Sequence, residues 1–372
     1  MGEWQGTLEV VGMILFADIF RGRKIVVTGH TGFKGSWLTL WLRQLGANVT
    51  GISLPPDTQP SHWNLLNTAH VSHNADINNL PQIKKLMQAA QPELVIHLAA
   101  QPLVRSSYAQ PLLTWQTNVM GTANVLEACR ELTSLRGILV ITTDKVYENH
   151  EDGVAFVEAD SLGGYDPYSA SKAACELVVQ SYRRSFFSLK GVLLASARAG
   201  NVIGGGDWAS DRLIPDIIRS MHEQSPLIIR NPFAVRPWQH VLDSLSGYLC
   251  LAHRLLMGDK DKAVAWNFGP DSTQRKTVED LLVQMKIHWP ALAWCENSSS
   301  QVHEAEQLRL DSAAARLHLG WQPIWGFEKT ARYTAEWYQH FYFNQELMSQ
   351  RQLDDYISDA VASGAAWANN KL

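Results

Sequence analysis

The first part of the chain alternates short apolar runs with longer stretches of helical periodicity. A β-branched run at residues 24–28 precedes a glycine-containing loop, and an apolar helical pattern then continues through Leu45. Gly46 stands where a helix stop is expected, and a second strand is predicted over residues 48–53. This order of strand, loop, helix and strand predicts a βαβ unit that opens a parallel sheet.

Further strands are predicted over residues 71–75, 94–98, 137–141 and 192–197, and helices over 111–132, 168–190 and 327–343. We therefore predict an α/β fold, a Rossmann-type doubly wound parallel sheet with a smaller mixed α/β C-terminal part that binds substrate. The predicted boundaries are an N-terminal extension at 1–20, a Rossmann domain at 21–200 to which residues of about 235–265 return, a substrate-binding part at 201–345 and a C-terminal tail at 346–372. The tail is amphipathic, and we interpret it as an oligomer contact or a loosely docked end.

The loop after the first strand spaces its glycines as G-x-x-G-x-x-G, at Gly29, Gly32 and Gly35. Glycines let such a turn close tightly and let a pyrophosphate approach the helix N-terminus. Any tight turn uses glycine, but between two strands the loop indicates a dinucleotide site. Asp57 and Ser53 are alternative partners for the adenosine ribose. Residues 50–61 contain no basic side chain, which favours NAD over NADP.

The strand at residues 137–141 ends in Thr143, Asp144 and Lys145, which offer a hydroxyl, an acid and an amine side by side. Ligands bind at the carboxyl ends of strands in open α/β sheets, so these groups are candidates for proton transfer. Taken alone, the stretch is equally consistent with a strand that ends in polar residues. Tyr168 and Lys172 share one face of the next helix and can reach the same cleft.

The composition of the 372-residue chain narrows the partners. The formal charge is −4, with 46% hydrophobic and 18% charged residues, which predicts no nucleic-acid partner and no anionic membrane partner. Four scattered cysteines form no metal-ligand spacing and no disulfide framework, so we expect no metal and a cytoplasmic location. The apolar run at 10–20 is too short to span a bilayer, and Met13 is a candidate natural start.

With Thr143, Tyr168 and Lys172 placed beside the glycine loop, residues 20–345 resemble the extended short-chain dehydrogenase/reductase family of nucleotide-sugar enzymes. Five segments, at 29–37, 99–105, 163–169, 198–208 and 236–241, resemble the 4,6-dehydratases of that family that act on a CDP-hexose. Lys145 distinguishes this group, because the related dehydratases for dTDP-glucose and GDP-mannose place a glutamate there.

The resemblance implies a redox-neutral dehydration of CDP-glucose with NAD. Tyr168, as a phenolate assisted by the charge of Lys172, would take the proton of the 4-hydroxyl, and Thr143 would orient that oxygen. Lys145 would remove the proton on carbon 5, and Asp144 would protonate the departing 6-hydroxyl. We also expect a homo-oligomer, either a dimer or a tetramer.

The remaining site predictions divide into cofactor and substrate contacts. The predicted NAD contacts are Gly29, Thr31, Gly32, Phe33, Lys34, Gly35, Ser53, Asp76, Ile77, Leu98, Ala99, Ala100, Asn118, Tyr168 and Lys172. The predicted sugar-nucleotide contacts are Gln101, Arg105, Asn201, Arg212, Arg236 and Arg309. Arginine suits a diphosphate because its planar guanidinium binds in a bidentate fork. The alternatives are another NAD-dependent sugar-nucleotide dehydratase or 4-epimerase, and a non-catalytic NAD-binding protein on the same fold.

Overall fold

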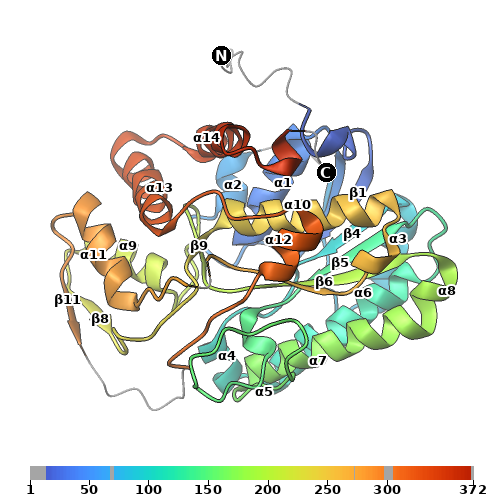
Figure 1. Cartoon of the computed structure of the whole chain (residues 1–372), viewed down its shortest axis with the longest axis horizontal. Coiled ribbons are helices and arrows are strands. Elements are labelled where there is room, and N and C mark those ends of the chain that lie inside the picture. Colours follow the sequence, from blue (N-terminus) through green and yellow to red (C-terminus); the bar gives the residue numbers. More distant parts are fainter. Residues whose placement is uncertain (1–13, 68–70, 272, 297–304, 370–372) are drawn as a thin grey trace.

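A parallel sheet of seven strands organises the molecule (Figure 1). The computed structural model describes residues 14–67, 71–271, 273–296 and 305–369. Across the sheet the strands run in the order β10 (Ala265–Phe268), β6 (Leu193–Ala199), β5 (Gly137–Ile141), β4 (Leu94–His97), β1 (Lys24–Thr28), β2 (Asn48–Ser53) and β3 (Val71–Asn74). All neighbouring pairs are parallel. The predicted Rossmann-type sheet is therefore confirmed, and its order reverses between β1 and β4, where such sheets bind ligands.

Helices cover both faces of the sheet because alternate strand residues point to opposite sides. On one face, Ile25 and Val27 of β1 pack in a core with α1 (Phe33–Gln44) and α10 (Val241–Met257). On the other face, Val26 packs in a second core with α3 (Leu80–Ala90) and α6 (Gly121–Cys129). The helix α7 (Pro167–Tyr182) contributes Val179 to that second core. Burial on both sides explains why these strands are continuous apolar runs.

The remaining elements form the connections and the second half of the molecule. The other helices are α2 (His62–Leu66), α4 (Val104–Ala109), α5 (Pro111–Trp115), α8 (Ser188–Lys190), α9 (Leu213–Glu223), α11 (Val278–His288), α12 (Ala313–Leu319), α13 (Phe327–Gln339) and α14 (Ser349–Ala362). Two small parallel sheets pair β7 (Val202–Ile203) with β9 (Gln239–His240), and β8 (Leu227–Ile229) with β11 (Trp294–Glu296). Short 3-10 or π-helical turns occupy Phe16–Asp18, Gln116–Met120, Asp144–Val146, Arg183–Phe187, Lys260–Lys262, His340–Asn344 and Ala366–Ala368.

The helices that follow β4 and β5 are less regular than their sequence periodicity predicts. The stretch predicted as one helix over 111–132 consists of α5, a π-helical turn and α6. The helix predicted over 168–190 likewise contains a π-helical turn between α7 and α8. A π turn shifts the register by only one residue, so the apolar periodicity hides it.

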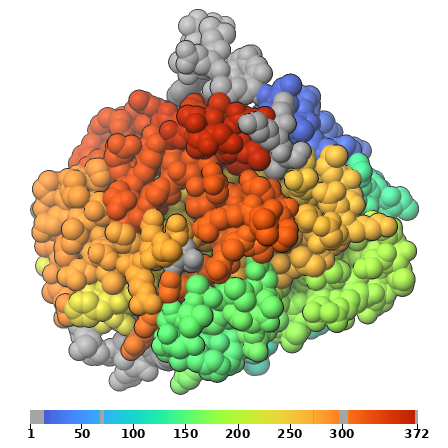
Figure 2. Space-filling model, in the orientation of Figure 1, coloured from blue at the N-terminus to red at the C-terminus, as the bar shows by residue number. Residues whose placement is uncertain are grey.

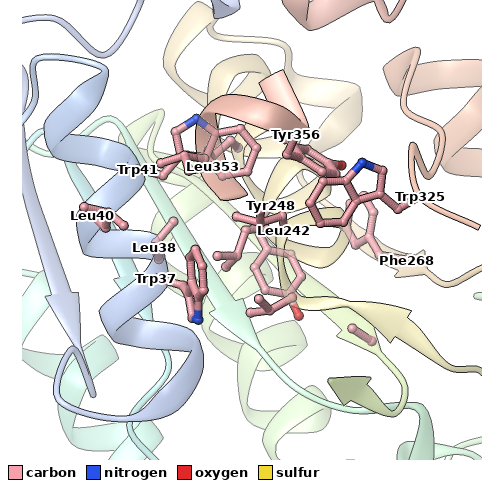
Figure 3. Close-up of a cluster of buried hydrophobic side chains, with 14 of the residues drawn as sticks. Trp37, Leu38, Leu40, Trp41, Leu242, Tyr248, Phe268, Trp325, Leu353 and Tyr356 are labelled. Atoms are coloured by element: carbon pink, nitrogen blue, oxygen red, sulfur yellow. The ribbon is translucent and has the colours of Figure 1, made fainter. Parts of the chain in front are cut away.

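The C-terminal segment is part of the core rather than a loosely docked end. Tyr356 of α14 lies edge-on to Trp41 of α1, with ring centroids 5.7 Å apart. Trp367 stacks on Phe16 at 4.9 Å, which also ties the described end of the N-terminal segment into the core. Figure 3 shows Trp41, Leu353 and Tyr356 in this cluster. Aromatic rings bury large areas, so these contacts stabilise both chain ends.

The second half of the chain adds the last strand to the sheet and covers part of one face, and it also forms a group of elements beside the sheet. The helix α10 packs on β5 and β6, and β10 adds an edge strand to β6. Figure 2 shows the orange and red C-terminal segments across the upper part of one face. Within the described ranges, no helix combines the length and the hydrophobicity needed to cross a bilayer.

Candidate active site

A cleft of about 970 Å³ opens at the carboxyl ends of the central strands. The glycine loop, the ends of β2, β4, β5 and β6, and the segments around α9 and β8 line it. All the candidate site residues except Asn118 and Arg309 belong to this lining. The structure therefore brings together residues as far apart in the sequence as Gly29 and Arg236.

The glycine loop has a shape that larger side chains would destroy. Gly29 has a φ of +74°, and a Cβ there would lie 2.6 Å from the backbone nitrogen of Ala99. A Cβ on Gly35 would lie 2.1 Å from the carbonyl oxygen of Gly29. Gly32 precedes α1, so the free N–H groups of the first helical turn face the cleft. This cradle fits the pyrophosphate of a dinucleotide.

Two hydroxyls mark the end of β2 beside that loop. The Oγ1 atom of Thr31 lies 2.7 Å from Oγ of Ser53, and it donates to the carbonyl of Leu54 at 2.9 Å. Ser53 and Asp57 both line the cleft, so both predicted partners of the adenosine ribose lie at the expected edge.

Asn118 lies behind the wall of the cleft rather than in it. Its Oδ1 accepts the N–H of Gln101 at 2.8 Å, and its Nδ2 donates to the carbonyl of Gln101 at 3.1 Å and to Ser171 Oγ at 2.9 Å. Gln101 lines the cleft, but its side-chain amide donates to Thr114 Oγ1 at 2.8 Å. Asn118 therefore supports the loop after β4. Its position does not fit the predicted direct contact with the cofactor.

The strand β5 ends in a helical turn that presents Asp144 and Lys145 to the same cleft. Thr143 caps this turn, and its Oγ1 accepts the N–H of Lys145 at 3.4 Å. The same hydroxyl donates to Asp144 Oδ1 at 2.9 Å, and Lys145 Nζ lies 3.1 Å from that oxygen. Asp144 is 1% exposed, and its Oδ2 has no hydrogen-bond partner among the described residues. The described residues thus satisfy only one oxygen of this buried carboxylate.

Gly200, at the end of β6, allows the neighbouring backbone to close on this carboxylate. A Cβ at that position would lie 2.8 Å from Asp144 Oδ2 and 2.3 Å from Cγ of Pro237. Any larger residue would push the second half of the molecule away from Asp144.

Tyr168 and Lys172 come from the first turns of α7. The carboxylate of Asp166 caps this helix by accepting the N–H of Ser169 at 3.0 Å. Burial raises the pKa of Tyr168 to about 12, against a lowering by a hydrogen bond with Thr143 and by the charge of Arg212. Burial lowers the pKa of Lys172, whose Nζ lies 3.5 Å from the carbonyl of Ile141. Arg212 is thus a cation that lowers the pKa of Tyr168, and the resemblance implies the same role for Lys172.

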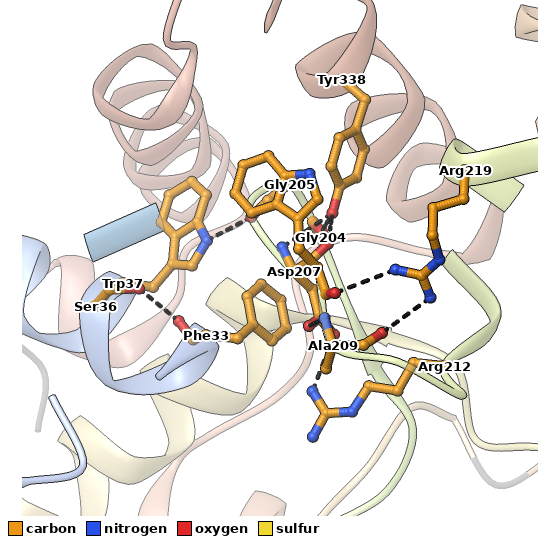
Figure 4. Close-up of polar contacts among 11 residues, drawn as sticks. Phe33, Ser36, Trp37, Gly204, Gly205, Asp207, Ala209, Arg212, Arg219 and Tyr338 are labelled. Atoms are coloured by element: carbon orange, nitrogen blue, oxygen red, sulfur yellow. Dashed lines mark hydrogen bonds and ion pairs between the residues drawn. The ribbon is translucent and has the colours of Figure 1, made fainter. Parts of the chain in front are cut away.

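Arg212 is held over the cleft by a loop from the second half of the molecule (Figure 4). Its guanidinium donates to Asp207 Oδ2 at 2.9 Å. The loop is anchored by Trp37 Nε1, which donates to the carbonyl of Gly205 at 2.9 Å, and by Tyr338, whose hydroxyl accepts the N–H of Asp207 at 2.9 Å. Asp207 therefore fixes the guanidinium of Arg212 at the lining of the cleft.

The other predicted substrate-binding arginines are placed differently from one another. Arg105 pairs with Asp211 at 3.3 Å across the cleft, and Arg236 donates to the carbonyl of Val235 at 3.0 Å. Arg309 donates to the carbonyl of Gly153 at 2.7 Å and is outside the cleft lining. Part of the segment at 303–309 lies outside the described residues.

Tyr248 of α10 is fully buried behind the cleft and contacts one of its lining residues, Lys34. Its hydroxyl accepts a hydrogen bond from Lys34 Nζ at 3.4 Å, and its pKa is raised by burial and by the nearby Tyr168 and Asp144. Burial and the charge of Arg212 lower the pKa of Lys34 to about 7. Figure 3 shows Tyr248 among apolar side chains, and a tyrosine in such a helix carries no sequence signal of a role in a site.

Comparison with known proteins agrees with this geometry. Residues 26–334 match the family model described as GDP-mannose 4,6 dehydratase. The chain belongs to this dehydratase family.

The proteins to which this chain is similar include enzymes named for several nucleotide sugars. The chain is 44% identical over 351 residues to CDP-glucose 4,6-dehydratase of Salmonella typhimurium, covering 92% of this chain and 98% of that protein. It is 27% identical over 335 residues to dTDP-glucose 4,6-dehydratase of Xanthomonas campestris, covering 84% and 92%. Among solved structures it is similar to TunA, an NAD-dependent NDP-hexosamine 5,6-dehydratase involved in tunicamycin biosynthesis. That match has a TM-score of 0.72 and 25% identity, and it covers 85% of this chain and 98% of that one.

Proposed function

We propose that this protein dehydrates CDP-glucose to CDP-4-dehydro-6-deoxyglucose with bound NAD. The observation that carries the proposal is the pair of buried Asp144 and partly exposed Lys145 beside Thr143 and Tyr168, with one carboxylate oxygen that has no partner among the described residues. The identity of 44% to a CDP-glucose 4,6-dehydratase, against 27% to a dTDP-glucose enzyme, supports CDP as the nucleotide. Lys145 supports the same choice, since the sequence resemblance distinguishes the CDP-hexose enzymes by this lysine.

The cleft supports NAD as the cofactor. The glycine cradle before α1 would hold the pyrophosphate, and Ser53 or Asp57 the adenosine ribose. The chemistry that NAD supplies when bound is the temporary removal of a hydride from carbon 4 and its return to carbon 6.

The protein's own groups divide the proton transfers among them. Tyr168 would accept the proton of the 4-hydroxyl, which it can do only as a phenolate. Neighbouring positive charges must therefore offset the rise in its pKa that burial causes. Lys145 would remove the proton on carbon 5, which the new ketone makes acidic. Asp144 would protonate the departing 6-hydroxyl, and the turn at Asp144–Val146 lets both groups reach one sugar.

The direct test is incubation of the purified protein with NAD and one of four substrates, CDP-glucose, dTDP-glucose, UDP-glucose or GDP-mannose. We expect the product from CDP-glucose to have lost one water by mass spectrometry, and the other three to react far more slowly. Water loss from another nucleotide sugar would make this a different dehydratase. Isomerisation without a change of mass would indicate a 4-epimerase, and no reaction despite bound NAD would revive a non-catalytic role.

We also propose a homo-oligomer, a dimer or a tetramer, that works in the cytoplasm in deoxysugar biosynthesis such as that of lipopolysaccharide O-antigen. Apolar side chains on neighbouring helices support the oligomer, since Leu112 and Trp115 of α5 and Leu177 of α7 are exposed. The four free cysteines fit a reducing compartment. Light scattering should give a mass of two or four chains, and deletion of the gene should remove the deoxysugar from the surface polysaccharide.

A further inference from the structure

The proton balance of the proposed dehydration, on which this inference rests, leaves the site changed after each turnover. The proton of the 4-hydroxyl is not returned, because the product keeps a ketone there, and Tyr168 therefore ends the cycle with one additional proton. Asp144 loses a proton to the departing water. Lys145 takes one proton from carbon 5 and later returns one to it, so its own proton count is unchanged. Before the next turnover, Tyr168 must lose this proton and the pair of Asp144 and Lys145 must gain one.

The structure places these groups in one row of polar contacts. The side chains of Tyr168 and Thr143 interact, and both line the cleft. The Thr143 hydroxyl donates to Asp144 Oδ1 at 2.9 Å, and Lys145 Nζ lies 3.1 Å from the same oxygen. A hydroxyl can accept one hydrogen bond while it donates another, so Thr143 can link a donor to an acceptor.

The connecting groups are shielded from solvent. Tyr168, Thr143 and Asp144 are 8%, 6% and 1% exposed. The neighbouring Thr142 does not take part, because its hydroxyl donates to Glu176 at 2.5 Å on the other side of the strand end. Thr143 therefore lies between Tyr168 and Asp144, and the adjacent Thr142 is a matched position outside this row of contacts.

We propose that Thr143 relays a proton from Tyr168 to the pair of Asp144 and Lys145 and so resets the site between turnovers. The O–H bond of Tyr168 breaks as a new one forms on Thr143 Oγ1, and the former Thr143 proton moves to Asp144 Oδ1 and from there to Lys145 Nζ. No electrons are exchanged. The products are the phenolate and the ion pair of Asp144 and Lys145 that the structure contains.

The test uses a variant that keeps the size of Thr143 but lacks its hydroxyl. Thr143→Val should convert CDP-glucose in a first turnover and then slow by about 100-fold, within the range for loss of a positioned proton-transfer group. Imidazole, a small proton carrier, should raise this slow steady-state rate in proportion to its concentration at constant pH and ionic strength. Thr143→Ser, which keeps the hydroxyl, and Thr142→Val should show no dependence on imidazole.

The dependence on imidazole decides the proposal, because loss of orientation of the substrate would not be repaired by a proton carrier. A steady-state rate of Thr143→Val that does not respond to imidazole overturns the relay, even if a first-turnover burst occurs, since slow product release also gives a burst. Rates with and without imidazole are compared in one preparation, so incomplete folding does not affect the ratio. A wild-type protein that removes no water from CDP-glucose would instead disprove the proposed function.

Discussion

Two buried carboxylates accept hydrogen bonds from adjacent threonines, yet their surroundings differ. Glu176 uses both oxygens: Oε1 accepts from Thr142 at 2.5 Å, and Oε2 accepts from Ser196 at 2.7 Å and from Arg198 at 3.0 Å. Asp144 uses only Oδ1, and its Oδ2 has no partner among the described residues.

The difference separates a structural group from a reactive one. Buried polar atoms in folded proteins are nearly always hydrogen-bonded, so an exception requires a reason. Glu176 lies in the middle of α7 and ties that helix to β6 through Arg198. Asp144 lies at the carboxyl edge of the sheet and lines the cleft, where a substrate can provide the missing partner.

The largest expected effect is on turnover, when the carboxylate of Asp144 is replaced. Asp144→Asn keeps the shape of the side chain but removes its ability to donate a carboxylic proton. We expect the rate of water loss from CDP-glucose to fall by about 1,000-fold, within the range for general acid catalysis. The thermal midpoint of the variant should stay close to that of the wild type. A variant with near-normal turnover would show that Asp144 is not the acid.

The next largest expected effect is on stability, at Glu176, whose two carboxylate oxygens both accept hydrogen bonds. Glu176→Gln leaves Arg198 buried without its charged partner, which costs about 3–5 kcal/mol when one member of a buried pair is removed. Urea unfolding at neutral pH measures this difference. The exposed pair of Glu131 and Lys84 provides the control, because Glu131→Gln should cost much less than Glu176→Gln. An equal cost for both substitutions would contradict the assigned role of Glu176.

The pH dependence of that difference follows from the pKa of Glu176. Burial alone would raise this pKa, but the charge of Arg198 and the hydrogen bonds lower it below the usual value for glutamate. A carboxyl whose pKa is lower in the folded state stabilises the protein above its unfolded pKa and loses that contribution in acid. The stability gap between wild type and Glu176→Gln should therefore narrow as the pH falls below about 4.5.

A smaller effect concerns Lys34, a partly buried cation that has a hydroxyl as its neighbour. Lys34, with a pKa lowered to about 7 chiefly by burial, donates to Tyr248. The unfolded chain keeps this proton up to a pH of about 10.5, so it binds more protons than the folded protein between about 7 and 10.5. The stability of the wild type relative to Lys34→Met should therefore rise with pH across that window. Lys24→Met, at an exposed position of β1, is the control that should lack this slope.

The sequence predicts the cofactor side of the cleft well because its determinants are local. The spacing of Gly29, Gly32 and Gly35 is enough to define a tight turn between a strand and a helix. The pair of Asp144 and Lys145 is recognisable for the same reason, since it directly follows an apolar strand. In both places the chemistry and the backbone geometry arise from a few neighbouring residues.

The other side of the cleft depends on contacts that local patterns do not contain. Tyr248 reaches Lys34 behind the cleft only because α10 returns to pack on β5, and Arg212 lines the cleft because Asp207 and Tyr338 fix its loop. Asn118 and Arg309 carry suitable side chains, but packing places them outside the lining. Arg212 acts on Tyr168 through space, which spacing along a helix cannot reveal.

The most direct test of the account is deuterium exchange at carbon 5 in Lys145→Ala. The wild type in heavy water should give a product with deuterium at carbon 5. The variant should still oxidise carbon 4 slowly, seen as absorbance of bound reduced cofactor, without deuterium at carbon 5 of the recovered sugar. Exchange at carbon 5 at the wild-type rate in this variant would contradict the assignment of Lys145 as the base.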